Sequence, residues 1–326
     1  MAALMNRVIG HEHQKQMLTQ AQLGESLPHA MVFAGPQGIG KQKLARALAQ
    51  NLVCENFRSA QGENFNGEAC GICGSCIRVE KNQSENLKVL APQNSAQIKI
   101  EQVREILDFL SFASDGKSRV IIIDQAQALN PQASNALLKT LEEPSANVFF
   151  ILITTDVRLL MPTIRSRSQV LLFKSLNLEQ LHQIKPALPE WVYKSARGQA
   201  GKLNEFSDGE AFDKRNSDLQ FFENFWCNEK FLLETEIKEF AKDRATALSI
   251  LKNWSVFTRD LILFSQGEKD QVMNSDQLAT LHNLKFIASD KLYDFFSALL
   301  QALNDVDKLD ITLLFESLWV KYARAS

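Results

Sequence analysis

The segment from Gly35 to Gln42 carries the residue types of a phosphate-binding loop. It reads G-P-Q-G-I-G-K-Q, close to the pattern G-x-x-x-x-G-K-[ST]. In that pattern backbone N–H groups surround the phosphates, the Lys contacts the terminal phosphates and the final hydroxyl binds Mg²⁺. Gly35, Gly38, Gly40 and Lys41 supply the loop, but Gln42 occupies the hydroxyl position. A Gln side chain is too long and bulky to replace that ligand, so the sequence predicts a remnant nucleotide site and leaves ATP binding doubtful.

A second segment carries the acid that such a site needs. Arg119 to Asp124 reads R-V-I-I-I-D, an apolar strand ending in Asp124. An Asp at this place commonly holds Mg²⁺, and in many P-loop ATPases a Glu follows it and activates the attacking water. Here Gln125 follows, and a Gln can orient water but cannot accept its proton. The metal hydroxyl and the base are both replaced, so we expect no efficient ATP hydrolysis by this chain.

Four of the five cysteines have the spacing of metal ligands. Cys70, Cys73 and Cys76 form C-x₂-C-x₂-C, and Cys54 precedes them. Two-residue spacers let thiolates converge on one ion, and four thiolates make a closed tetrahedral zinc site. We therefore predict structural zinc, with disulfides and an iron–sulfur cluster as the alternatives. Cys227 lies far away in an apolar helical stretch and is predicted to be a buried thiol.

Composition limits the classes of protein to which the chain can belong. Its 326 residues allow two or three domains, and 45% of them are hydrophobic, which is ample for a buried core. The net charge of −2 gives no global basic field, so any DNA contact must come from a local patch. The sequence shows neither a long apolar run nor an N-terminal signal-peptide pattern, which predicts a cytoplasmic protein without a membrane partner.

Hydrophobic periodicity predicts α/β structure followed by helices alone. Helix 131–142 has Asn130 as N-cap and Pro131 at its first position. Because strands and helices alternate, the sheet should be mainly parallel and covered on both faces. From Leu176 onward strand signals fade. The expected strands are 29–34, 87–90, 119–124, 148–154 and 169–173, and the expected helices include 13–24, 41–55, 100–112 and 131–142.

Three short segments resemble the clamp-loader subunits of the AAA+ family. They are N-A-L-L-K-T-L-E-E-P at 135–144, L-I-T-T-D at 152–156 and T-I-R-S-R at 163–167. The four-cysteine insertion sits where bacterial clamp loaders carry a zinc module, and V-I-G-H at 8–11 is similar to the family's N-terminal box. The resemblance is strong over 1–175 and weak in the C-terminal third.

The resemblance implies an architecture and a set of partners. Residues 1–175 would form an AAA+ P-loop domain with a four-cysteine zinc insertion at 54–76. A small helical lid would follow at 176–210, and a helical collar domain at 211–326 would mediate oligomerisation. The implied partners are the motor ATPase and clamp-opening subunits of a hetero-pentamer, the sliding clamp and primer–template DNA, all within a DNA polymerase III holoenzyme.

Residue roles follow from the same resemblance. Arg167 matches the arginine finger that enters a neighbouring subunit's nucleotide site, with Arg165 a less favoured candidate. The family motif Ser-Arg-Cys ends here in Ser168, but the chemistry of a finger lies in its guanidinium. Thr154 or Thr155 matches the sensor threonine that contacts the terminal phosphate.

One further position bears on the nucleotide site. Gly201 stands where the family has a second sensor Arg, which removes another nucleotide contact.

Two basic residues are candidates for DNA contact. Lys99 and Arg104 flank the start of a helix and could contact DNA phosphates, or are simply solvated charges.

Three functions compete. The favoured one is a non-hydrolysing, stator-like subunit that donates its finger in trans. The alternative is an ATP-hydrolysing motor subunit of the same family. A nucleic-acid-binding zinc protein that works alone is the third, and the helical C-terminal third argues against it.

Overall fold

The computed structural model describes residues 3–57, 67–93, 95–111, 118–205, 209–227, 243–306 and 308–323. The chain divides into two compact units. The first comprises Met1–Pro186 and Arg197–Lys202, and the second comprises Ala187–Ala196 and Leu203–Ser326. The segment expected to form a lid, 176–210, is thus shared between the units, and a division into three domains stays a prediction.

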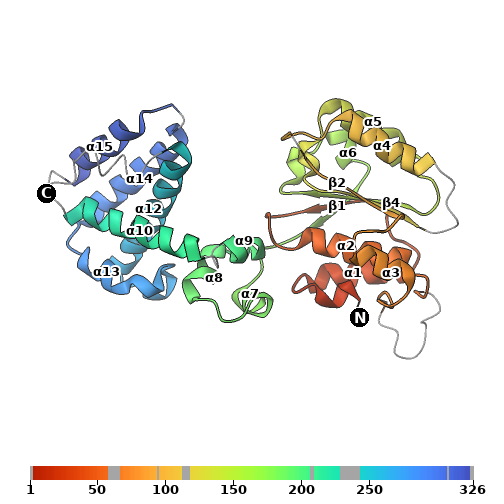
Figure 1. Ribbon diagram of the computed structural model, residues 1–326, viewed down its shortest axis with the longest axis horizontal. Helices are drawn as coiled ribbons and strands as arrows, with labels where there is room; N and C mark the ends of the chain where they lie inside the picture. Colours follow the sequence, from red (N-terminus) through yellow and green to blue (C-terminus); the bar gives the residue numbers. More distant parts are fainter. Residues whose placement is uncertain are drawn as a thin grey trace. The chain divides into compact units, whose positions relative to one another are not determined.

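The strands are β1 (Ala30–Ala34), β2 (Leu87–Leu90), β3 (Arg119–Ile123), β4 (Val148–Thr154) and β5 (Gln169–Leu172). The α-helices up to residue 205 are α1 (Glu12–Leu23), α2 (Lys41–Val53), α3 (Gly74–Glu80), α4 (Ile100–Ser111), α5 (Pro131–Glu142), α6 (Pro162–Arg165), α7 (Leu178–Ile184), α8 (Glu190–Ala196) and α9 (Ala200–Glu205). Those that follow are α10 (Gly209–Cys227), α12 (Arg244–Ser265), α13 (Leu278–Asn283), α14 (Ser289–Asp305) and α15 (Ile311–Tyr322) (Figure 1).

The five strands form one parallel sheet in the order β2-β3-β4-β1-β5. In register, Val32 of β1 pairs with Leu152 of β4 on one side and with Val170 of β5 on the other. The predicted α/β sheet is therefore confirmed, with helix and strand ends within two residues of expectation. Helix α4 is described as far as Ser111, and Phe112, the last residue of the expected helix, lies outside the described residues.

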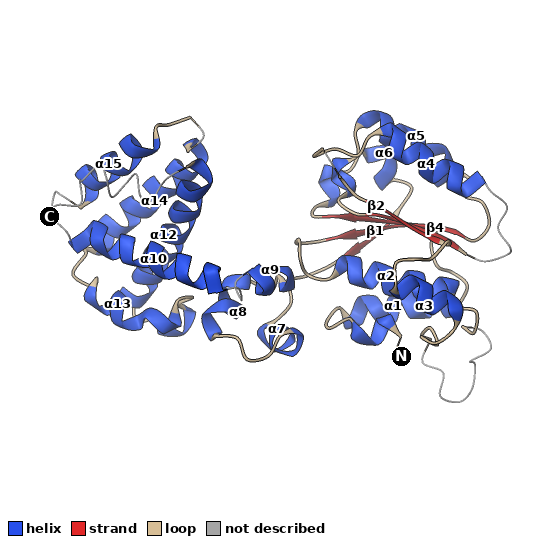
Figure 2. Cartoon of the chain, in the orientation of Figure 1, coloured by secondary structure: helices blue, strands red, loops and turns tan. Residues whose placement is uncertain are grey.

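Alternation along the strands sends side chains to two different helical layers. Met31 and Phe33 of β1 pack on the side of α1, α2 and α3, whereas Val32 packs on the side of α4, α5 and α6. Figure 2 shows the strands between these layers. Burial on both faces explains why β1, β3 and β4 are almost continuously apolar.

The second unit is helical, as the sequence predicts. Its helices pack around an aromatic core. Phe222, Phe225 and Trp254 are fully buried there. Helix α8 joins this unit through Trp191, whose ring lies 3.9 Å from the Arg215 guanidinium. Arg215 also pairs with Asp276 at 2.7 Å.

The prediction of a buried Cys227 is wrong. It is the last residue of α10 and is exposed, because Phe225 and Trp226 are the side chains at this helix end that enter the core. Among the described helices, none combines the length and apolar character required to cross a bilayer.

Candidate functional site

The loop between β1 and α2 is the predicted phosphate-binding loop. Gly35 is in close contact with the chain end of β5, and a Cβ atom there would lie 2.3 Å from the carbonyl oxygen of Phe173. Gly38 has a φ of +74°, which glycine adopts without the steric cost of a side chain. Strand, loop and helix thus follow in the order expected for a P-loop fold.

Lys41, the loop lysine, is bonded to its own loop. Its side chain is almost completely buried, and Nζ donates hydrogen bonds of 2.6 Å to the carbonyl oxygens of Gly35 and Pro36. Burial lowers the pKa of Lys41 to about 8, while the nearby Asp124 carboxylate acts in the opposite direction. The structure therefore brings the predicted lysine and acid near each other.

Two backbone-directed contacts hold the rest of the loop. The N–H of Gly201, at the start of α9, donates to the carbonyl oxygen of Gly38 at 2.9 Å. On the other side, Nε2 of His11 lies 2.8 Å from the carbonyl oxygen of Ile39. Burial lowers the pKa of His11, so the neutral imidazole donates its Nε2 proton here. Sequence reasoning missed His11 as a loop contact, although the V-I-G-H segment around it was a usable signal.

The residues at the positions of the metal-binding hydroxyl and of the catalytic base lie outside the core. Gln42 and Gln125 are both exposed. Gln125 has a φ of +53°, and its N–H bonds to Oδ1 of Asp124 at 3.0 Å. Of the two sensor candidates, Thr154 is buried and donates to the carbonyl oxygen of Asp156 at 3.0 Å, whereas Thr155 is exposed. Thr155 is the better placed of the two to meet a phosphate from solvent.

Arg167, the finger candidate, is one-third exposed just after α6. Its Nη1 donates to the carbonyl oxygen of Thr163 at 2.9 Å and to Oγ of Ser166 at 3.2 Å. Its Nη2 lies 2.5 Å from Oε1 of Glu142, with side-chain exposures of 33% and 48% for the two residues. Arg165, the less favoured candidate, is exposed.

The four predicted metal ligands converge. The sulfur atoms of Cys54, Cys70, Cys73 and Cys76 all lie within 4.8 Å of one another, and none forms a disulfide. Backbone N–H groups point at the sulfurs, from Cys70 to Cys54 at 3.3 Å and from Cys76 to Cys73 at 3.5 Å. A hydrogen bond from the Cys76 thiol lowers the pKa of Cys54, and the same bond together with burial raises the pKa of Cys76. Thiolates in this arrangement fit one tetrahedrally bound cation.

Buried amides of α2 tie the cysteine cluster to the main domain. Nε2 of Gln50 donates to the carbonyl oxygen of Cys76 at 3.1 Å, and its Oε1 accepts from the N–H of Leu4 at 2.8 Å. Oδ1 of Asn51 accepts from the N–H of Ala69 at 2.9 Å. Helix α2 therefore begins at the predicted phosphate-binding loop and ends at the four-cysteine cluster. Sequence reasoning missed these two amides, because nothing in the spacing of a polar residue shows which backbone group it will meet.

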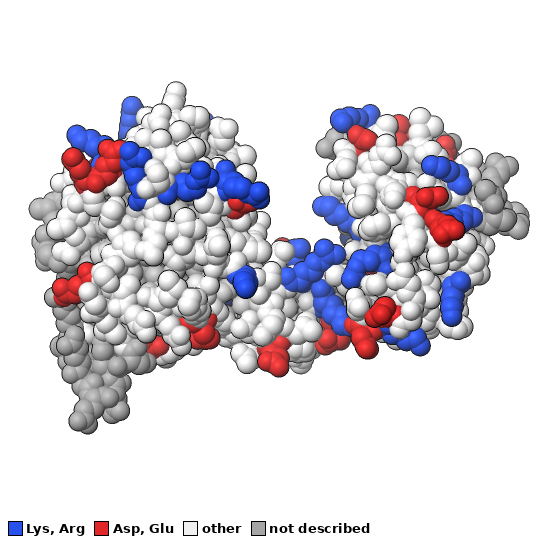
Figure 3. Space-filling model, turned by 180° about the vertical axis from the view of Figure 1, so that it is seen from behind, with Lys and Arg blue, Asp and Glu red and all other residues white. Residues whose placement is uncertain are grey.

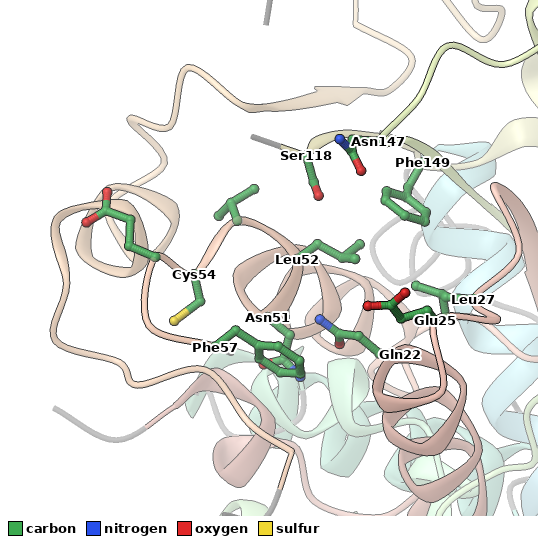
Figure 4. Close-up of a pocket in the computed structure, with 12 residues that line it drawn as sticks. Gln22, Glu25, Leu27, Asn51, Leu52, Cys54, Phe57, Ser118, Asn147 and Phe149 are labelled. Carbon is green, nitrogen blue, oxygen red and sulfur yellow. The ribbon is translucent and has the colours of Figure 1, made fainter. Parts of the chain in front are cut away.

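A pocket of about 730 Å³ lies beside Cys54. In Figure 4, Asn51 and Phe57 lie on one side of it, and Asn147 and Phe149 lie on the other. Since Asn147 precedes β4, the pocket is at the amino ends of the parallel strands, opposite the loop. Of the predicted site residues, only Cys54 is among the described residues that line it.

The DNA-contact candidates Lys99 and Arg104 are both exposed near the start of α4. The Lys99 N–H donates to Oε1 of Gln102 at 3.1 Å, which secures the beginning of this helix. On the face drawn in Figure 3, Lys and Arg side chains are mixed with Asp and Glu side chains.

Residues 10–177, a little more than half of the chain, match the family described as "DNA polymerase III, delta subunit". The chain is similar to DNA polymerase III subunit tau of Salmonella typhimurium, with 36% identity over 185 residues, 56% of this chain and 27% of that protein. It is also similar to DNA polymerase III subunit delta' of Pseudomonas aeruginosa, with 36% identity over 156 residues, 47% of this chain and 45% of that protein. The chain thus spans less than half the length of each of these relatives.

The fold is similar to that of a DNA polymerase III gamma subunit-related protein from Thermotoga maritima. The TM-score is 0.50 with 13% identity, over 94% of this chain and 98% of that one. At this identity the likeness concerns the fold alone, an AAA+ type of sheet domain with a helical C-terminal part.

Proposed function

The chain belongs to the DNA polymerase III delta subunit family, and from this premise we propose that it is a non-hydrolysing clamp-loader subunit of the delta-prime type. It works in the cytoplasm within a hetero-pentamer of motor and clamp-opening subunits, which loads the sliding clamp onto primed DNA. Its own contribution to ATP hydrolysis is Arg167, inserted into the nucleotide site of a neighbouring motor subunit.

The loss of the metal hydroxyl and of the base carries the first half of this proposal. With Gln42 and Gln125 at those two positions, the loop lacks the chemistry for turnover. The delta' relative from Pseudomonas aeruginosa supports this assignment, while the tau relatives support the alternative, a motor subunit.

The placement of Arg167 supports the second half. A planar guanidinium forms paired, charge-assisted hydrogen bonds with phosphate oxygens, and fingers supplied in trans accelerate phosphoryl transfer by roughly 10³–10⁵ in well-studied systems. One-third of the side chain is exposed, at the end of a short helix on the domain surface. A subunit without a working site of its own can in this way still be needed for hydrolysis.

We also propose that Cys54, Cys70, Cys73 and Cys76 hold structural zinc. The convergence of the four sulfurs supports this, and the closed ligand set leaves no coordination position for catalysis.

The deciding experiment is steady-state ATPase and clamp loading by the reconstituted complex carrying Arg167→Ala. We expect reduced ATPase with unchanged assembly, and poor rescue by Arg167→Lys, because an ammonium lacks the planar fork. Arg165→Ala, at the other finger candidate two residues away, is the comparison variant. If the comparison variant loses activity and Arg167→Ala does not, the finger is Arg165. If neither does, the chain donates no finger from this segment.

A further inference from the structure

We propose that Glu142 is a latch for Arg167, holding its guanidinium in cis until a neighbouring subunit's phosphate displaces the carboxylate. This inference rests on the proposed function of Arg167 as a finger. The inference adds a regulatory residue, Glu142, whose carboxylate accepts from Arg167 in the isolated subunit.

The geometry shows a guanidinium whose two terminal nitrogens are already engaged. Nη2 contacts the Glu142 carboxylate at 2.5 Å, while Nη1 donates to Thr163 and Ser166. The N–H groups that bind a carboxylate are the same ones that bind phosphate oxygens. These contacts use three of the five N–H donors of the Arg167 guanidinium, so a phosphate has the full set of donors only after Nη2 leaves Glu142.

The position of Glu142 suits a contact that must be both formed and released. It is the last residue of α5, where the helix dipole places partial negative charge and a carboxylate is unfavourable without a cation nearby. Arg167 supplies that cation. Because both side chains are partly exposed, at 33% and 48%, solvent weakens the pair and makes exchange of the carboxylate for a phosphate feasible.

The latch determines the fraction of subunits in which Arg167 is released from Glu142 and can bind a neighbour's phosphate. When only the unlatched fraction can engage a neighbour's nucleotide, the apparent affinity falls by that fraction. Exposed ion pairs of this kind shift equilibria by roughly one and a half to five times. The latch thus raises the ATP concentration at which the site next to this chain reaches half of its maximal rate, and the maximal rate stays nearly the same.

The test uses the assembled complex, with motor subunits able to hydrolyse ATP only at the site next to this chain. ATPase is measured against ATP concentration for Glu142→Gln and for the adjacent, exposed control Glu143→Gln, each alone and combined with Arg167→Ala. We expect Glu142→Gln to lower the half-saturating ATP concentration by a factor of roughly one and a half to five, with less change at high salt, and Glu143→Gln to leave it unchanged. In the Arg167→Ala background Glu142→Gln should have no effect.

Each outcome separates the latch from the finger. If Arg167→Ala leaves ATPase at the wild-type level, the finger itself is wrong and the latch falls with it. If Arg167→Ala lowers ATPase while Glu142→Gln matches wild type, the finger stands and the latch alone is overturned. A higher half-saturating concentration, or a Glu142→Gln effect that persists without Arg167, also overturns the latch.

Discussion

The backbone N–H of Gly201 and the carbonyl oxygen of Gly38 are joined by a 2.9 Å hydrogen bond that closes the tip of the phosphate-binding loop. The fit is close, since a Cβ atom on Gly201 would lie 3.3 Å from the Cα of Gly38. At Gly201, which we predict to match the family's second sensor arginine, this chain therefore packs backbone against backbone. Lys41 bonds to Gly35 and Pro36, so the start and the tip of the loop are both bonded within the protein.

The isolated chain should show no Mg²⁺-dependent ATP turnover above background. Gln42 and Gln125 replace the metal ligand and the base, and an isolated chain has no neighbouring subunit that could supply either group. For the same reason Lys41→Ala should leave clamp loading by the assembled complex nearly intact. Phosphate release by the purified chain is the measurement. Turnover near about 1 s⁻¹, the low end for ordinary enzymes, would identify a motor subunit, as would collapse of loading in a folded Lys41→Ala variant.

Lys41 should make stability depend on pH in the alkaline range. Burial lowers its pKa from 10.5 to about 8. Between these values the unfolded chain binds more protons than the folded chain, so the free energy of unfolding rises with pH. Across this window the gain is on the order of 3 kcal/mol relative to Lys41→Met, which has no group to titrate. Urea unfolding of both proteins, followed by circular dichroism from pH 7.5 upward, measures the difference. Parallel pH profiles of the two proteins would show that folding does not lower the pKa of Lys41.

The sheet was predictable because each of its signals is local. Apolar runs such as 148–154 bounded by turn residues predict buried strands, and Asn130 followed by Pro131 predicts a helix start that the structure confirms, with the Asn130 side chain accepting from the N–H of Ala133. The clustering of the four cysteines was predictable for the same reason, since three of them lie within seven residues of sequence.

The partners of the site residues were not predictable, because they come from distant parts of the chain. Gln50 bonds to Leu4 and Cys76, and Arg167 pairs with Glu142, from which β4 and α6 separate it in the sequence. Polar side chains have no periodicity that identifies a partner, and one hydrogen bond is too weak to leave a pattern in composition. The prediction of a buried Cys227 failed for a related reason, because apolar neighbours in the sequence do not determine the helix face on which a residue lies.

Metal content tests the cysteine cluster. The purified chain should contain about one zinc ion, and Cys73→Ser should lose it, because the remaining three thiolates no longer close a tetrahedron. Cys227→Ser is the matched control and should keep its zinc, since Cys227 is exposed and lies in the second unit. Elemental analysis measures both. A coloured, redox-active sample containing iron would instead indicate an iron–sulfur cluster.

Metal loss should also loosen the C-terminal end of α2. Gln50 and Asn51 bond to backbone groups of the cysteine module, and metal binding free energy is partly folding free energy. Amide hydrogen exchange of peptides covering residues 46–54 should therefore accelerate in Cys73→Ser and after chelation, with little change in β4. Unchanged exchange at the end of α2 would show that the module folds independently of the helix.

Lys99 and Arg104 should contribute to DNA affinity through phosphates alone. Both are exposed at the start of α4, on the opposite face of the sheet from α3. Each phosphate contact contributes a slope of roughly 0.7 to 0.9 to the dependence of log affinity on log salt. Complexes carrying Lys99→Ala and Arg104→Ala together should therefore bind primed DNA more weakly, with a salt slope shallower by up to about 2. Lys81→Ala, an exposed lysine at the end of α3, is the control and should leave the slope unchanged. Fluorescence anisotropy at several salt concentrations measures it. If the double variant and the control share the wild-type slope, Lys99 and Arg104 are solvated charges, and the phosphate contacts of the complex come from other residues.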